Sequence, residues 1–167
     1  MLSWALLALL VLAVGLLWWR GRAERAERSA AWDAVARALS LGFDPGSRSI
    51  RGKYRLLRLE ITARRAQLGL GRWRTEILAE YEGVVPAGLT LSIGARGLRS
   101  SAQDRGALDA WLDAHRRREL LPPLLTGGVR VSGHTVHAGA PGLLTEPEAL
   151  RSLLTQLAEL AKLLSAR

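Results

Sequence analysis

Residues 49–65 read SIRGKYRLLRLEITARR, and this stretch decides the fold. Apolar residues alternate with polar ones along it, but Ile50 and Tyr54 occupy even positions whereas Leu57 and Ile61 occupy odd ones. Successive side chains of a β-strand point to opposite faces, so one unbroken strand cannot keep both sets on the same face. We therefore predict two antiparallel strands joined by a tight turn between Tyr54 and Leu57.

The alternation continues on the C-terminal side of this stretch. Three further sets follow: Ile77, Ala79 and Tyr81 after a turn at residues 69–71, then Leu89, Leu91 and Ile93, and finally Val129, Val131 and Val136 around Gly133. Short alternating segments separated by glycine are typical of antiparallel sheets. The pattern predicts an antiparallel β-meander with a C-terminal hairpin.

Helical spacing of apolar residues appears in three segments around these strands. Residues 23–41 and 101–121 show it, the second being ended or kinked by Pro122 and Pro123. Residues 150–164 show it most clearly, and Thr145 with Glu148 has the spacing of a capping box before them. We predict an α+β domain, residues 21–167, in which three helices pack on the sheet.

A transmembrane anchor is predicted at residues 1–20. Residues 2–19 carry no charge, and a helix of 18 residues is about 27 Å long, close to the ~30 Å hydrocarbon layer. A cleaved signal peptide needs a positive stretch before the apolar one and small residues after it, and neither is present. The interfacial side chains of the predicted anchor are Trp4, Trp18, Trp19, Arg20 and Arg22.

The charges beside this segment predict its orientation. Arg20, Arg22, Arg25 and Arg28 all follow it, and positive charge is retained on the cytoplasmic side. We expect a single-pass protein of the inner, cytoplasmic membrane, with its N-terminus outside and its domain in the cytoplasm. The chain has no cysteine, which removes disulfides, thiolate metal sites and thiol nucleophiles.

The net charge of +9 is concentrated in residues 44–74, which carry nine basic residues against two acidic ones. We call seven of these basic residues the basic stripe and expect them to contact an anionic surface: Arg51, Lys53, Arg55, Arg58, Arg64, Arg72 and Arg74. An anionic leaflet is the nearest such surface. The free energy of attraction is on the order of 1 kcal/mol for each basic side chain close to it. Nucleic acid is disfavoured because few aromatic residues accompany the charges. An arginine excess produced by genome composition remains an alternative.

Reactive groups do not converge in the sequence. His134 and His137 are three apart on a predicted strand and face opposite ways, so we predict no metal site there. Asp109 and Asp113 share a helical face, which is usually the solvated face. No nucleophile elbow or phosphate loop is present. We predict no catalytic residues and no cofactor.

The chain resembles a group of uncharacterised bacterial membrane-anchored proteins with a small α+β domain of unknown function. The resemblance is carried by an N-terminal apolar helix, a final apolar helix and these positions between them: Trp32, Ala36, Leu39, Leu41, Phe43, Gly52, Tyr54 and Thr75. These positions imply a fold and no catalytic residues.

Together these features predict a membrane-anchored, non-enzymatic binding or scaffolding protein. Two alternatives stay open. One is an assembly subunit that docks a protein partner through the helix of residues 150–164, and the other is an enzyme of unfamiliar type using Asp109, Asp113 or the histidines.

Overall fold

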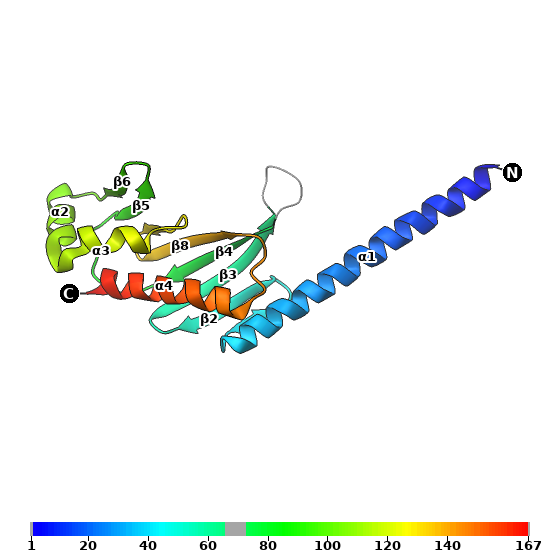
Figure 1. Ribbon diagram of the computed structural model, residues 1–167, viewed down its shortest axis with the longest axis horizontal. Helices are drawn as coiled ribbons and strands as arrows, with labels where there is room; N and C mark the ends of the chain where they lie inside the picture. The colour runs from blue at the N-terminus through cyan, green and yellow to red at the C-terminus, as the bar shows by residue number, and fades with distance from the viewer. Residues whose placement is uncertain (1, 66–72, 167) are drawn as a thin grey trace.

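The computed structural model describes residues 2–65 and 73–166, with side chains described for 12–64 and 73–166 (Figure 1). The elements in chain order are α1 (Leu2–Ala38), β1 (Gly42–Asp44), β2 (Ser49–Tyr54), β3 (Leu57–Arg65), β4 (Trp73–Glu80), β5 (Thr90–Gly94), β6 (Gly97–Ser101), α2 (Arg105–Asp113), the 3₁₀ turn η1 (Ala114–Arg116), α3 (Arg117–Leu124), β7 (Arg130–Ser132), β8 (Thr135–Pro141) and α4 (Pro147–Ser165). The α+β class predicted from the sequence is confirmed.

The tight turn predicted between Tyr54 and Leu57 is present. These two residues are directly paired at the end of the β2–β3 hairpin, and Arg55 in the turn has a positive φ of 53°. The change of parity at this turn brings Ile50 and Ile61 opposite each other, both fully buried. The predicted turn at residues 69–71 lies outside the described residues.

The strand order differs from a simple meander. Within the described chain, the strands form one antiparallel sheet in the order β1-β2-β3-β4-β8-β7-β5-β6, so the C-terminal hairpin lies between β4 and β5. Tyr81, just after β4, donates its backbone N–H to the carbonyl of His134 and its hydroxyl to that of Gly133. These bonds hold the β7–β8 turn beside the end of β4, and alternation alone does not reveal such a long-range partner.

Two predictions about helix ends were wrong. The predicted helix of residues 101–121 is broken at His115 and Arg116, which both adopt left-handed φ values, and Pro122 and Pro123 lie inside α3. The N-cap of α4 is Glu146 without a side-chain cap bond, so Thr145 and Glu148 form no capping box.

The core lies between one face of the sheet and the helices. The stripe of α4 is buried there, with Leu154, Leu157 and Leu164 fully inaccessible. Two bonds fix where α4 lies: Arg151 donates to the carbonyl of Ala38, and Ser165 donates to that of Glu82. Figure 1 shows α4 lying along the sheet. The apolar face of the C-terminal helix is therefore occupied by the domain itself.

A buried arginine joins the helices at the end of the domain far from α1. Arg117 is 2% exposed and donates to the carbonyls of Trp111, Leu163 and Ala166, while its guanidinium lies 4.4 Å from the centre of the Trp111 ring. Burial lowers the pKa of Arg117, and these carbonyl and aromatic contacts offset that cost. The contacts tie α2 and α3 to the C-terminal end of α4.

The first helix is continuous over 37 residues, where the sequence suggested an anchor and a separate helix beginning at residue 23. Its last turns are in the core: Trp32, Val35 and Ala36 are at most 3% exposed. Its first half extends away from the domain (Figure 1). Among the residues whose side chains are described, no helix is both long and apolar enough to cross a membrane. Residues 2–11 of the predicted anchor lie outside that part.

Candidate functional site

The sheet has one face that no described helix covers, and we call it the open face. Alternate residues of the central strands point to it, because their neighbours are buried in the core on the other side. One row of paired residues crosses it from β2 to β7: Arg51, Glu60, Leu78, His137 and Arg130. The surface is polar and rich in arginine.

The structure brings most of the basic stripe to this face. Arg51, Lys53, Arg58, Arg64 and Arg74 are all exposed there. Arg55 lies in the β2–β3 turn and pairs instead with Glu159 of α4 at 3.5 Å, and Arg72 lies outside the described residues. Arg130 of β7 lies on the same face, although the sequence did not predict it as part of the basic stripe. Only the insertion of the C-terminal hairpin beside β4 brings it there.

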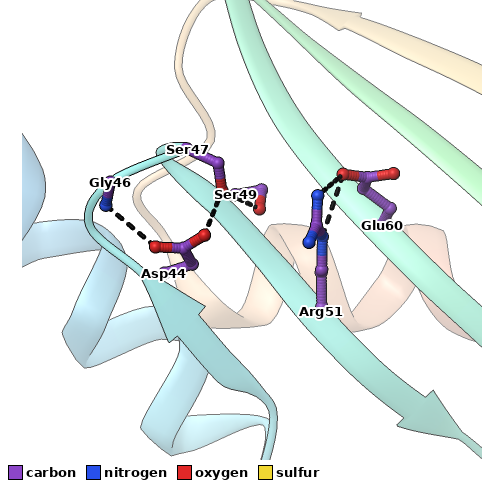
Figure 2. A network of polar contacts seen from close by, with 6 residues as sticks. All are labelled: Asp44, Gly46, Ser47, Ser49, Arg51 and Glu60. Carbon is purple, nitrogen blue, oxygen red and sulfur yellow. Dashed lines mark hydrogen bonds and ion pairs between the residues drawn. The ribbon is translucent and has the colours of Figure 1, made fainter.

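Carboxylates neutralise part of this charge. Arg51 contacts Glu60 at 2.5 Å, a pair that is visible in Figure 2, and Arg64 contacts Glu76 at 3.1 Å. Glu80 is the third acid of the face and is paired in register with Arg58. Arg99 of β6 also belongs to this face, because it and Arg130 are both paired in register with Ser92. Seven basic residues against three acids leave a net charge of +4 on the described part of the open face.

Two pairs of like charges stand directly opposite each other across neighbouring strands. Lys53 is paired with Arg58 across β2 and β3, and Arg64 with Arg74 across β3 and β4. Directly opposed like charges destabilise a sheet, so these pairs cost the fold free energy. An anionic partner placed between the two members of a pair would remove that cost.

Each like-charged pair borders a hollow of the open face. Lys53 and Arg58 line one of about 380 Å³, and Arg64 and Arg74 line another of about 590 Å³. In the larger hollow the Arg74 guanidinium lies across Gly139, in the space that a β-carbon would occupy. Each hollow is lined by three basic residues and two glutamates, which leaves a net charge of +1 beside room for an anionic group.

The two pairs lie at opposite ends of the strands. Arg58 and Arg64 are six residues apart on β3, a separation of about 20 Å. The Arg64 end is near α1, because the guanidinium of Arg28 on α1 lies 5.2 Å from the centre of the Trp73 ring at the start of β4. The basic stripe thus has a part near α1 and a part far from it.

The turn between β1 and β2 holds its shape through the carboxylate of Asp44 (Figure 2). Asp44 accepts hydrogen bonds from the Gly46 backbone N–H at 2.9 Å and from the Ser47 hydroxyl at 2.5 Å, and Ser47 in turn contacts the buried Ser49 at 2.7 Å. The Ser47 hydroxyl, followed by the backbone N–H groups, lowers the pKa of Asp44 below its ordinary value. The carboxylate is consequently charged and bonded at neutral pH.

Asp109, Asp113 and His134, which the sequence offered as catalytic alternatives, are engaged in structural contacts. Arg118 contacts both Asp109 and Asp113, at 2.7 and 2.5 Å, and the two carboxylates raise the pKa of that guanidinium. His134 contacts the Gly83 carbonyl, and His137 lies on the open face. Among the described residues, no three His, Cys, Asp or Glu side chains are grouped so that they could hold a metal ion.

The predicted interfacial residues of α1 are exposed where they are described. Trp18 and Trp19 are 59% and 69% exposed, the Arg22 guanidinium lies 5.4 Å from the centre of the Trp18 ring, and Arg20 contacts Glu24 at 3.8 Å. Trp4 lies outside the described side chains.

Comparison of the chain with protein-family models, with curated proteins and with solved structures finds no match. The resemblance noted from the sequence stays a prediction.

Replacing Lys53 by Glu tests the cost of the like-charged pair. The substitution turns the Lys53–Arg58 contact into an attractive one, so the free energy of unfolding should rise by about 0.2–1 kcal/mol. Urea unfolding of the full chain in detergent micelles measures it. Arg96→Glu makes the same charge change in the exposed β5–β6 turn and should leave stability within about 0.5 kcal/mol. A loss of stability in Lys53→Glu would contradict the electrostatic interpretation.

Proposed function

We propose that the chain is a single-pass membrane-anchored, non-enzymatic binding or scaffolding protein of the cytoplasmic membrane, with its domain in the cytoplasm and its N-terminus outside. The observation that carries the proposal is the exposure of apolar side chains on α1. Six large ones between residues 12 and 19 are each at least 58% exposed: Leu12, Val14, Leu16, Leu17, Trp18 and Trp19.

These side chains surround the helix. Each residue of an α-helix is rotated by about 100° from the one before it, so the six are distributed over the whole circumference. One packed neighbour covers one side of a helix, whereas lipid covers every side. A helix that is apolar all round is typical of a membrane span or the centre of a large protein, and this half of α1 contacts no described part of the domain.

The open face supports a binding role for the domain. Its distal like-charged pair, Lys53 and Arg58, lies about 20 Å further along the strands than Arg64 and Arg74, beyond the ~8–10 Å over which salt screens charge. We infer that Arg64 and Arg74 contact the anionic leaflet. We infer that Lys53 and Arg58 bind an acidic surface of a protein partner.

Less supports the alternative in which the C-terminal helix docks a partner, because the apolar stripe of α4 is buried in the core. A catalytic role receives no supporting observation either, because Arg118 is bonded to both candidate carboxylates.

The anchor is tested by alkaline carbonate extraction of membranes that contain the full chain. The wild-type protein should stay in the membrane pellet. Leu12→Arg with Val14→Arg should move it to the supernatant, since each arginine costs about 2.5–3.5 kcal/mol near the middle of a span.

The matched control for the anchor is Ala23→Arg with Ala26→Arg, exposed positions on the same helix beyond the apolar stretch. This variant should remain in the pellet. Extraction of the wild-type protein by carbonate would contradict the anchor. Protease added to intact spheroplasts should leave the domain uncut, and cleavage there would contradict the cytoplasmic orientation.

The partner-binding role of the open face is tested by co-purification in mild detergent. Lys53→Glu with Arg58→Glu should lose an acidic protein that the wild type retains, because both charges that face it are reversed. Arg96→Glu with Arg105→Glu changes the same charge at exposed positions in the β5–β6 turn and at the start of α2, off the open face, and should retain it. Equal retention by both variants would remove the open face from the proposal.

A further inference from the structure

A cleft lies between α1 and the end of the sheet nearest to it, on the face opposite the open face. Its volume is about 460 Å³. One wall is the α1 segment from Gly21 to Trp32, and the other is formed by side chains of the strands and turns, among them Phe43, Arg48 and Trp73. The cleft belongs neither to the open face nor to the basic stripe.

The cleft combines cationic groups with an aromatic floor. Arg25, Arg28 and Arg48 line it against a single acid, Glu24, which leaves a net charge of +2. Trp32 and Phe43 contribute apolar surface. Such a cleft suits a phosphate group, because the arginines can bind its oxygens and the apolar wall keeps water away from them.

The arginines are oriented by bonds that leave donors available. Arg25 and Arg28 each use Nε to donate to a carbonyl one turn earlier on α1, at 2.8 Å. Within the described residues, the terminal nitrogens of Arg25 and the whole guanidinium of Arg48 have no hydrogen-bond or ion-pair partner. A guanidinium has five N–H donors suited to phosphate oxygens.

Arg48 is held in an unfavourable backbone conformation. Its φ is 52°, in the left-handed region where Gly or Asn has a lower cost than a long side chain. The bonds of Asp44 and Ser47 described above keep the turn in this form (Figure 2). A residue strained in this way and lining a cleft indicates that its side chain is used there.

The position of the cleft along α1 matches the depth of lipid head groups. Gly21 is two residues and Arg28 nine residues beyond Trp19, which is about 3 and 14 Å along the helix. The head-group layer extends roughly 5–8 Å beyond the hydrocarbon. Arg28 itself lies beyond that layer. However, Arg25 and Arg28 donate back to the carbonyls of Gly21 and Glu24, about 3 and 8 Å beyond Trp19, so these two guanidinium groups lie within the layer if residues 2–19 span the bilayer.

We propose that this cleft binds the phosphate of an anionic phospholipid of the cytoplasmic leaflet, an inference that rests on the membrane anchoring proposed above. Arg25, Arg28 and Arg48 hold the phosphate. Trp32 and Phe43 close the end of the cleft nearest the domain core. One bound lipid per chain fixes the domain against the bilayer at the exit of α1.

Native mass spectrometry of the purified full chain in mild detergent measures the lipid it retains. The probes are phosphatidylglycerol, which is anionic, and phosphatidylcholine, which is zwitterionic. The wild type should bind one phosphatidylglycerol on the order of tenfold to a hundredfold more tightly than phosphatidylcholine. Arg25→Gln, Arg28→Gln and Arg48→Gln combined should abolish this preference.

Two further variants separate binding from folding and from general charge. Arg96→Gln, Arg99→Gln and Arg105→Gln combined remove the same charge at exposed positions outside the cleft and should keep the preference. Arg48→Gly relieves the strained φ, so it should preserve or raise stability while weakening phosphatidylglycerol binding.

The outcomes distinguish the cleft from the anchor. An unchanged preference in the cleft variant, or an equal loss in the control, overturns the lipid site. Displacement of the lipid by millimolar inorganic phosphate also overturns it, because the cleft would then be a site for the free ion. If the wild type stays in the carbonate-washed pellet but shows no lipid preference, the cleft proposal fails and the anchor stands. If the wild type is extracted by carbonate, the anchor fails, and the cleft proposal fails with it.

Discussion

The arrangement of the whole molecule depends on one helix that belongs to two environments. The last turns of α1 bury Trp32, Val35 and Ala36 in the domain core, while its residues 12–19 expose large apolar side chains on every side. No break separates the two halves. Because the helix is anchored by core packing, the domain has one position along it. For a charged group on α1, the distance from the end of the apolar stretch is then set by helical rise. For a charged group on the strands, it is set by how the domain packs on α1.

Under the proposed anchoring, this constraint assigns different roles to the positive charges of the chain. The cleft arginines and the pair formed by Arg64 and Arg74 lie at the end of the domain near α1, where a leaflet is within the reach of screened charge. Lys53 and Arg58 lie at the far end of the strands, where an acidic protein surface is the matching partner. The fold keeps two opposed cationic pairs despite their cost, and an anion bound between the members of a pair would offset that cost.

Local patterns in the sequence predicted the elements that form between residues close together in the chain. The change of parity between Tyr54 and Leu57 predicted the β2–β3 hairpin, and the stripe of residues 150–164 predicted a packed helix. The strand order was not predictable in this way, because the Tyr81 bonds that place the C-terminal hairpin beside β4 join segments about 50 residues apart. For the same reason the sequence did not reveal Arg130 as part of the open face. It also did not reveal Arg48 as part of the cleft, since that position depends on a turn packed near α1.

Cysteine scanning of residues 12–31 in native membranes tests the continuous helix with two environments most directly. The chain contains no cysteine of its own, so each introduced thiol reports alone. A water-soluble maleimide should fail to label every position from 12 to 18, whichever side of the helix it occupies. Positions 22–27 should all be labelled, because each is exposed. Labelling should become periodic only from residue 28, where one side of the helix begins to face the domain. Labelling with that same periodicity between residues 12 and 18 would show that water reaches this half of α1, and would contradict the account.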